Sequence, residues 1–502
     1  MEKCIGIDFG MQNLKVCYSD GRKNYKVDLE GKQQSDLKLS PNVVYYYEDE
    51  EGNFSKAFFA SQKAEDARRA GSPDYVRYIK RTLQQEKWSR TVCGGKYSFS
   101  TEDIITDIFR QIAFKMEEYR YDMTAPTILT VPVVFSEIQK ARLRYCAEQA
   151  GFSVHEVITE PFSAIFSDDI RDECLDVDDD DDEKYVLVFD FGASTLDLCL
   201  FGVSEDSVRS LASAGMNFGG KDISDMIVFD LKEKLSETVS ELIESGRFDD
   251  DMSEFELFEL AERMKNSLYE EAETPETDDM FFGEKIVLKQ VNMDKMLEKS
   301  GVWEKIENLI QEMLESVDEG VESDDIKQVV MVGGSSRIEW FREKTENYFD
   351  NAELVGDPEE DDFIYNSVAL GAINYVNEDM EIQNSLPMSI GVDLGKGFEV
   401  VLNRNTFYSA KGKRKQISLE YLERNNYRIK IYQTLNNTRH AEITDEGILY
   451  AGFFELDGSL YDAESIYVRL SQTKDGLIME TMQMQDNDYK VIESCLELRT
   501  EV

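Results

Sequence analysis

A short segment near the N-terminus, Ile5-Gly6-Ile7-Asp8-Phe9-Gly10, returns in closely similar form as Leu187-Val188-Phe189-Asp190-Phe191-Gly192. In both copies an apolar run ends in Asp-Phe-Gly, and a second apolar run follows, from Leu14 to Tyr18 and from Leu196 to Phe201. Each copy predicts a strand, a tight turn and a second strand. Glycine lets backbone N–H groups approach phosphate oxygens, and an adjacent aspartate can hold a hydrated Mg²⁺ ion. Two such turns predict two related lobes that hold one triphosphate from opposite sides.

Length and charge exclude several classes of protein. At 502 residues the chain exceeds what one hydrophobic core normally supports, so two or three domains are expected. Because no apolar run reaches ~18 residues, no membrane span is expected. The net charge of −47 argues against nucleic acid as a partner, since the phosphates would be repelled. The dense acidic run 176–183 is interpreted as a solvated loop.

The N-terminus and the cysteines indicate a cytoplasmic protein. The first residues lead directly into the predicted strand, which leaves no room for a cleavable signal. The seven cysteines are scattered singly without a Cys-x-x-Cys pair, which suits a reducing compartment and argues against a zinc site. The two histidines, His155 and His440, lie far apart, so neither a Ser-His-Asp site nor a His-metal centre is expected.

Residues 1–376 alternate strand-like and helix-like segments, which is typical of an α/β architecture. Strands are expected within 126–134, 186–191 and 329–332. Helices are expected within 101–119, 136–150, 221–245, 253–271 and 294–319. Residues 377–385 are polar and lose this periodicity, so they are interpreted as an interdomain linker.

From residue 386 the pattern changes to a period of two. Ile417, Leu419 and Tyr421 alternate with polar residues, and similar alternation recurs in later segments. This predicts an all-β domain over 386–490, followed by a short tail, 491–502, with no long helical segment. A third Asp-x-Gly copy, from Ile390 to Gly397, falls inside this domain and is interpreted as an ordinary hairpin turn.

In chain order, these and further motifs resemble those of the 70-kilodalton heat-shock chaperones, the DnaK type. The resemblance extends from about Ile5 to about Met484. No single motif is decisive, but their order and spacing are specific. Besides the two hairpins they are Ile79-Lys80-Arg81, Thr130-Val131-Pro132, Ala150-Gly151-Phe152, Thr159-Glu160-Pro161, Phe218-Gly219-Gly220-Lys221-Asp222, Ala261-Glu262-Arg263-Met264-Lys265, Val332-Gly333-Gly334-Ser335-Ser336-Arg337-Ile338, Leu386-Pro387-Met388-Ser389-Ile390-Gly391 and Arg404-Asn405-Thr406.

The resemblance implies a two-lobed, actin-like ATPase domain followed by a β-sandwich domain similar to a peptide-binding module. It implies ATP or ADP with Mg²⁺, the metal held by Asp8 and Asp190, and catalysis by Lys80, Glu160 and Thr195. Such hydrolysis is mostly positioning and electrostatic stabilisation, to which the Lys80 ammonium would contribute a point charge near the γ-phosphate. The nucleotide-binding residues that it implies are Asp8, Gly10, Met11, Gln12, Asn13, Asp190, Gly192, Ala193, Ser194, Thr195, Gly219, Gly220, Lys221, Glu262, Lys265, Gly333, Gly334, Ser335 and Arg337.

The sequence departs from the family pattern in the site itself. Met11 and Gln12 stand where the family has two hydroxyl residues, so two side-chain donors to phosphate are lost. Ala193 and Ser194 replace two glycines, and their Cβ atoms would crowd a phosphate. Tyr269 stands where the adenosine helix of the family carries a small hydroxyl residue.

The linker and the β domain depart from the family as well. Glu381 interrupts the apolar run of the family's linker, so docking of this linker is expected to bury less apolar surface. Ser418 and Arg428 lie about where the family's peptide groove is apolar.

The leading hypothesis is an ATP-binding, chaperone-like protein that couples ATP binding and slow hydrolysis to polypeptide binding. Its expected partners are unfolded or extended polypeptides and co-chaperones. The alternative is a scaffold with a nucleotide-gated or degenerate site, whose β domain binds one dedicated protein. A third hypothesis is a small-molecule kinase, because sugar kinases share the two-lobed core. The β domain and the order of the motifs argue against this hypothesis.

Overall fold

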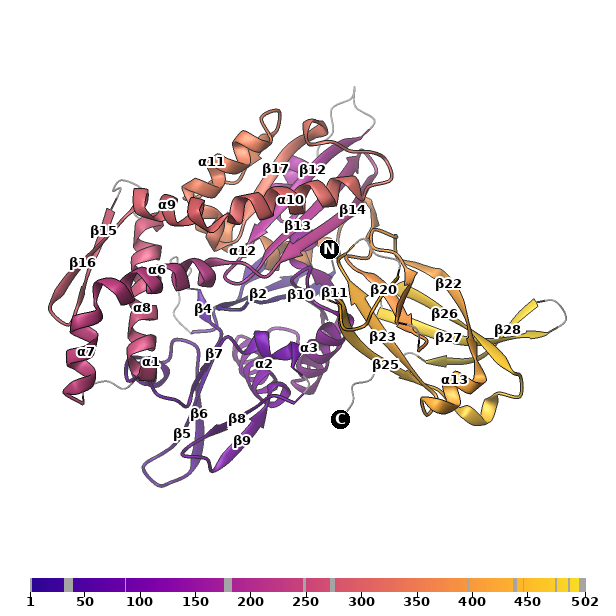
Figure 1. The fold of residues 1–502 in the computed structure, drawn as a ribbon, viewed down its shortest axis with the longest axis horizontal. Coiled ribbons are helices and arrows are strands. Elements are labelled where there is room, and N and C mark those ends of the chain that lie inside the picture. The colour runs from indigo at the N-terminus through magenta and orange to yellow at the C-terminus, as the bar shows by residue number, and fades with distance from the viewer. Residues whose placement is uncertain are drawn as a thin grey trace.

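The computed structural model describes most of the chain (Figure 1). The described residues are 2–30, 39–85, 87–175, 183–246, 250–270, 276–395, 397–436, 440–445, 447–474, 476–485 and 488–495. The acidic run expected to form a loop lies outside them except for Glu183, and the expected tail is described only to Cys495. Within the described residues, no helix is long and apolar enough to cross a membrane.

The first predicted hairpin forms the centre of a six-stranded sheet. β1 (Lys3–Phe9) pairs antiparallel with β2 (Asn13–Asp20) and parallel with β10 (Pro126–Val131). β11 (Ser153–Thr159) extends the sheet beyond β10, and β3 (Asn24–Lys26) and β4 (Ser40–Pro41) both pair with β2. Apolar residues of β1 and β2 share a core with α2 (Thr101–Glu118) and α3 (Glu137–Gln149).

The second predicted hairpin occupies the equivalent place in another six-stranded sheet. β12 (Lys184–Phe191) pairs antiparallel with β13 (Leu196–Ser204) and parallel with β17 (Ile326–Val332). β18 (Glu353–Val355) follows β17, while β14 (Ser207–Met216) and β19 (Glu381–Gln383) continue the sheet beyond β13. The registers match, because Asp8 lies opposite Lys15 and Asp190 lies opposite Asp197.

Helices cover the second sheet and connect it to the first. α6 (Gly220–Lys234), α8 (Asp250–Glu270), α10 (Val302–Glu315) and α11 (Glu339–Tyr348) contribute to one core with β12 and β13. Another core combines residues of both sheets with α12 (Asp361–Tyr375). Gly6 permits the close approach of α12 to β1, because a Cβ there would lie 2.5 Å from the carbonyl oxygen of Ala369.

Smaller elements complete this part of the chain. They are β5 (Val43–Glu48), β6 (Phe54–Phe58), β7 (Tyr75–Arg77), β8 (Ser89–Val92), β9 (Tyr97–Ser100), β15 (Glu276–Phe281), β16 (Glu284–Lys289), α1 (Gln62–Arg69), α4 (Glu160–Ala164), α5 (Asp168–Cys174), α7 (Ser236–Glu244), α9 (Gln290–Ser300) and the 3₁₀ turns η1 (Ile79–Gln84), η2 (Ser323–Asp325) and η3 (Gly334–Arg337).

Two of the expected helices are each divided in two. The segment 221–245 forms α6 and α7, which meet at Leu235, and the segment 294–319 forms α9 and α10. The second break lies at Gly301, whose φ of 64° is left-handed and ends α9. Because glycine adopts this conformation without a steric penalty, it is a common helix terminator.

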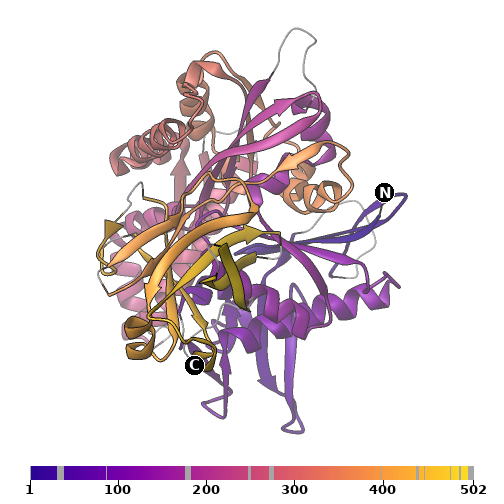
Figure 2. The ribbon, with the colours of Figure 1, turned by 90° about the vertical axis from the view of Figure 1, so that its right-hand side faces the viewer.

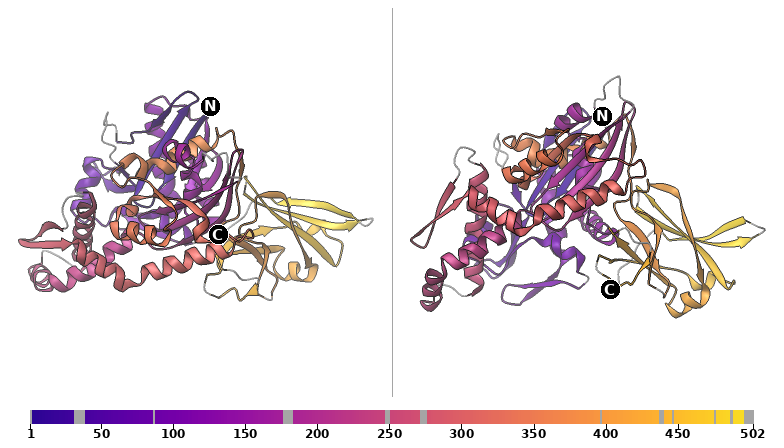
Figure 3. Two further views of the ribbon diagram at one scale, coloured as in Figure 1. Left: turned by 90° about the horizontal axis from the view of Figure 1, so that it is seen from above. Right: turned by 45° about the horizontal axis from the view of Figure 1, so that its top comes forward.

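The C-terminal part is all-β, as the alternation predicts. One sheet contains β20 (Ser389–Asp393), β21 (Phe398–Leu402), β23 (Arg428–Thr434), β24 (His440–Ala441) and β25 (Leu449–Glu455). The other contains β22 (Ser409–Ser418), β26 (Ser465–Thr473), β27 (Gly476–Gln485) and β28 (Asp488–Cys495), and η4 (Gly458–Leu460) lies outside both. Apolar residues of the two sheets form one core. These strands project to one side of the rest of the molecule (Figures 1 and 3) and face the viewer in Figure 2.

The third Asp-x-Gly copy is a hairpin, as expected. Gly395 has a φ of 81° and donates its N–H to Asp393 at 2.7 Å, between β20 and β21. The alternation at Leu419 and Tyr421 was misleading, however, because α13 (Leu419–Arg424) begins there. Ser418 caps this helix by accepting a hydrogen bond from the backbone N–H of Tyr421.

The segment expected to be a linker contains β19, which pairs parallel with β14. Ile382 lies opposite Val208 and packs partly buried against the core that both sheets share. Glu381 is exposed, so its charge does not prevent the pairing. The C-terminal β sheets contact α3 directly. The side chain of Gln433, on β23, accepts a hydrogen bond from the backbone N–H of Glu137 at 2.6 Å.

Candidate functional site

The turns of the two hairpins line one cavity of about 190 Å³. The lining residues that the sequence predicts are Asp8, Gly10, Met11, Gln12, Asn13, Lys80, Glu160, Asp190, Gly192, Ala193, Ser194, Thr195, Gly220, Lys265, Gly333, Gly334 and Ser335. Those that it missed as site residues are Lys15, Leu39, Pro132, Asn266, Ile364, Tyr365 and Val368. The structure therefore brings segments from across the first 370 residues to one place.

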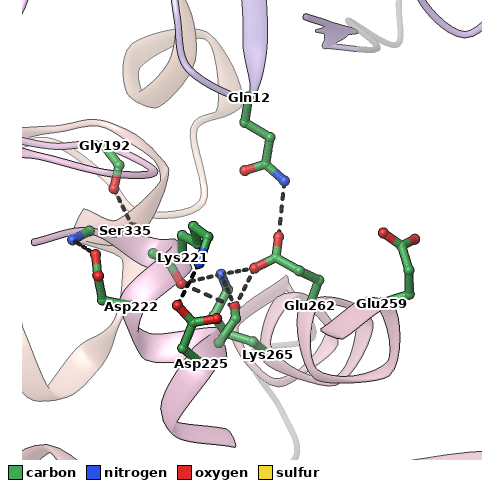
Figure 4. A network of polar contacts seen from close by, with 12 residues as sticks. Gln12, Gly192, Lys221, Asp222, Asp225, Glu259, Glu262, Lys265 and Ser335 are labelled. Carbon is green, nitrogen blue, oxygen red and sulfur yellow. Dashed lines mark hydrogen bonds and ion pairs between the residues drawn. The ribbon is translucent and has the colours of Figure 1, made fainter. Parts of the chain in front are cut away.

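The second turn is held by the start of α6 and by the loop after β17. The backbone N–H groups of Gly220 and Lys221 donate to the carbonyl oxygens of Gly192 and Ala193, at 3.1 and 2.8 Å. The hydroxyl of Ser335 donates to the carbonyl oxygen of Gly192 at 2.8 Å (Figure 4). Gly219 must lack a side chain, because a Cβ there would lie 2.3 Å from the backbone nitrogen of Ser194.

Four of the predicted nucleotide-binding residues, Gly219, Lys221, Glu262 and Arg337, do not line the cavity itself. The Lys221 ammonium is paired with Asp225 at 2.5 Å (Figure 4). The guanidinium of Arg337 lies 4.9 Å from the ring centroid of Tyr365, which does line the cavity. Arg337 therefore contacts a lining residue but does not line the cavity itself.

Glu262 connects α8 with the first hairpin. Its carboxylate accepts hydrogen bonds from Gln12 at 2.9 Å and from Lys265 at 2.7 Å, and it also accepts one from Ser224 (Figure 4). Burial alone would raise the pKa of Glu262, but Lys265 and these hydrogen bonds hold the pKa below its ordinary value. Gln12, in the turn of the first hairpin, therefore contacts the opposite side of the cleft.

Lys80 and Glu160 form a buried ion pair beside the two turns. The Lys80 ammonium, on η1, lies 2.8 Å from a carboxylate oxygen of Glu160, and the Lys80 residue is 1% exposed. Glu160 begins α4 and precedes Pro161, which fixes the backbone there. Burial raises the pKa of Glu160, although the Lys80 ammonium opposes this shift.

Asp190 and Asp197, on the second hairpin, complete a cluster of carboxylates. Burial and the charges of Glu160, Asp197 and Asp8 hold the pKa of Asp190 well above its ordinary value. Burial also raises the pKa of Asp197 to about 7, with the charge of Glu160 adding to the shift. Asp197 accepts a hydrogen bond from the backbone N–H of Val133 at 2.6 Å.

The cluster contains fewer ammonium groups than carboxylates. Asp8 pairs with Lys15 at 2.7 Å and Glu160 pairs with Lys80. Among the described residues, Asp190 and Asp197 form no ion pair with an ammonium. Four carboxylates and two ammonium groups would leave two negative charges if all were ionised. This excess contributes to the raised pKa values of the second hairpin.

The donors present are compatible with Mg²⁺. It prefers carboxylate oxygens and usually takes one or two of them together with phosphate oxygens and waters. Among the described residues, no group of three or more His, Cys, Asp or Glu side chains forms a complete metal cage. Asp8 and Asp190 would therefore hold the ion jointly with phosphate oxygens, and Lys15 already contacts one oxygen of Asp8.

The raised pKa of Asp197 makes the stability of the ligand-free protein depend on pH. Between the ordinary value of 3.8 and about 7, the folded state keeps a proton that the unfolded state has lost. The free energy of unfolding therefore falls as pH rises through this window, by roughly 1.4 kcal/mol per unit. We expect Asp197→Asn, which does not titrate, to stabilise the protein by about 2–3 kcal/mol more at pH 8 than at pH 5.

Urea unfolding of the two proteins at both pH values measures this difference. Asp206→Asn, at an exposed turn between β13 and β14, is the matched control and should change stability equally at both pH values. An equal effect of Asp197→Asn at pH 5 and pH 8 would show that Asp197 is already ionised in the folded state at pH 5.

The arrangement is that of a cleft between two equivalent β-hairpins, combined with a separate pair of β sheets. Residues 61–487 match the family model described as Hsp70 protein, so the chain belongs to the Hsp70 family. Members of this family are ATP-binding heat-shock chaperones that act in protein folding and bind ATP or ADP with Mg²⁺. The matched stretch begins after the first hairpin, which carries Met11, Gln12 and Lys15.

Proposed function

We propose that this protein binds ATP–Mg²⁺ between two lobes of an actin-like domain and couples its binding and slow hydrolysis to polypeptide binding by the β sandwich. The observation that carries this proposal is that two hairpins with the same strand register have their turns at one cavity. Their turns, at Gly10 and Gly192, offer backbone N–H groups to phosphate from opposite sides. The proposed domains are 1–376, 377–385 as linker, 386–490 and a tail from 491.

Each part of the cleft has a proposed role. Lys80 stabilises the charge that develops on the transferred phosphoryl group, Glu160 orients the attacking water, and the Thr195 hydroxyl contacts the γ-phosphate. Asp8 and Asp190 hold Mg²⁺ through its waters. The loop at Gly333 and Gly334 approaches the adenine, and Lys265 with Glu262 reaches the ribose.

A second candidate is a scaffold whose altered site is degenerate or gated by nucleotide. The contact between Gln12 and Glu262 favours this candidate, because it joins the first hairpin to α8 across the cleft. Under this hypothesis the β sheets bind one dedicated protein rather than many unfolded chains.

Titration calorimetry with ATP–Mg²⁺ tests the proposal, together with the shift in melting temperature. A ligand at ~100 times its dissociation constant stabilises the native state by ~2.7 kcal/mol. We expect Ala193→Leu to weaken ATP binding by about 10- to 100-fold, since overpacking a filled site costs about 1–3 kcal/mol. Ala193 lines the cavity, and its backbone oxygen is already fixed by α6.

Ala70→Leu is the matched control, because Ala70 is exposed at the end of α1 and does not line the cavity. It should bind ATP as the wild type does. A turnover assay with and without unfolded polypeptide then separates the two candidates. No binding of ATP–Mg²⁺ by the folded wild-type protein would reject the first and support the degenerate site.

A further inference from the structure

The two hairpins differ in charge at one equivalent position. Lys15 lies opposite Asp8 in the first hairpin, and Asp197 lies opposite Asp190 in the second. The same place in the strand register therefore carries an ammonium on one side of the cleft and a carboxylate on the other. Because the registers are the same, this difference results from the residues and not from the backbone.

The Lys15 ammonium lies beside the turn of the first hairpin. It is 2.7 Å from a carboxylate oxygen of Asp8, and a Cβ placed on Gly10 would lie 3.4 Å from the ammonium nitrogen. The side chain of Lys15 is 18% exposed, and the residue lines the cavity together with Gly10 and Asp190. An ammonium here is next to the turn where phosphate oxygens are expected.

Lys15 lies beside more of the cluster than its direct partner, because it lines the same cavity as Glu160 and Asp190. Lys265 also lines the cavity, but its ammonium pairs with Glu262 at 2.7 Å. Without Lys15, the ammonium of Lys80 would be left to compensate for the four carboxylates of the described cluster.

We propose that Lys15 is a built-in cation of the nucleotide site, which takes over part of the charge compensation that a divalent metal supplies. This inference rests on the proposed function, since it concerns the binding of ATP in the same cleft. A fixed ammonium beside Asp8 neutralises that carboxylate and attracts phosphate oxygens without a bound ion. ATP binding by this protein therefore depends only weakly on Mg²⁺.

The measurement is the dissociation constant of a non-hydrolysable ATP analogue, by calorimetry, with excess Mg²⁺ and with EDTA. For the wild-type protein we expect removal of the metal to weaken binding by less than about tenfold. Lys15→Met keeps the length of the side chain and removes its charge. For this variant we expect removal of the metal to weaken binding of the analogue by about 100-fold or more. Lys15→Arg keeps the charge and should resemble the wild type.

Lys3→Met is the matched control. Lys3 forms an ion pair with Asp122 at 2.8 Å at the other end of β1, outside the cleft. If the pair of Lys15 and Asp8 were only structural, Lys15→Met and Lys3→Met would both change stability without changing the ratio of the two dissociation constants.

The outcomes for the wild type distinguish a failure of the role of Lys15 from a failure of the proposed function. Binding with Mg²⁺ that falls about 100-fold or more in EDTA would overturn the inference and leave the proposed function intact. No binding under either condition, by protein that is folded by circular dichroism, would overturn the proposed function itself. Because these arms use only the wild-type protein, they remain decisive even if Lys15→Met fails to fold.

Discussion

Lys80→Met is expected to lower ATP turnover by about 100-fold while changing ATP affinity by less than about threefold. The ammonium of Lys80 is held by Glu160 at 2.8 Å and lies against the ring of Phe135, so its position is fixed before substrate binds. A fixed charge of this kind stabilises the charge that develops in the transition state more than it stabilises bound ATP. Single-turnover assays and calorimetry measure the two effects separately.

The same substitution leaves the Glu160 carboxylate buried without its partner. Removing one member of a buried ion pair typically costs about 3–5 kcal/mol of stability. The double variant Lys80→Met/Glu160→Gln removes the unpaired charge and should recover much of that loss without restoring turnover. Arg81→Met changes a neighbouring residue outside the pair and should keep turnover within about twofold of the wild type. Full turnover in the Lys80→Met protein would remove Lys80 from the catalytic role.

The sequence predicted the hairpins because their signal is local. An apolar run, Asp-Phe-Gly and a second apolar run specify a turn and two strands without information from elsewhere in the chain, and both hairpins form as expected. Lys15 was missed because a lysine in an alternating strand is usually a solvated side chain. The available signal was the register, since a turn after Gly10 places position 15 opposite Asp8.

Other parts of the site depend on contacts that no local pattern contains. Gln12 and Glu262 are 250 residues apart in the chain, and their hydrogen bond exists only because α8 lies across the cleft from the first hairpin. Tyr365 reaches the cavity from α12, a segment that none of the expected helices or motifs covers. The resemblance predicts Arg337 as a nucleotide-binding residue, and its contact with Tyr365 emerges only from the packing.

The predicted linker shows what a count of apolar residues leaves out. The charge of Glu381 predicts less apolar burial on docking, but it says nothing of backbone pairing. In the structure the segment pairs through its backbone, with the N–H of Glu381 donating to the carbonyl oxygen of Asp206 at 2.8 Å. Since side chains alternate along a strand, Glu381 faces solvent while Ile382 packs against the core.

Ile382→Asp is therefore expected to increase proteolytic cleavage within 377–385 by at least about tenfold. Fully burying an isoleucine contributes about 1.5–3 kcal/mol, and Ile382 is partly buried and would be replaced by a charge. A loss of about 1.4 kcal/mol raises the population of the undocked segment tenfold, and cleavage follows that population when opening and closing are fast. Proteinase K digestion, with the cleavage sites identified by mass spectrometry, measures the rate.

Glu381→Ala is the control at the adjacent position. The Glu381 carboxylate is exposed and accepts a hydrogen bond from Gln383, at 2.9 Å. Cleavage of this variant should stay within about twofold of the wild type, because surface substitutions usually change stability by less than about 0.5 kcal/mol. If both variants were cleaved equally fast, the charge at 381 would matter as much as burial at 382. Cleavage of Ile382→Asp at the wild-type rate would show instead that the backbone pairing between β14 and β19 holds the segment without help from the Ile382 side chain.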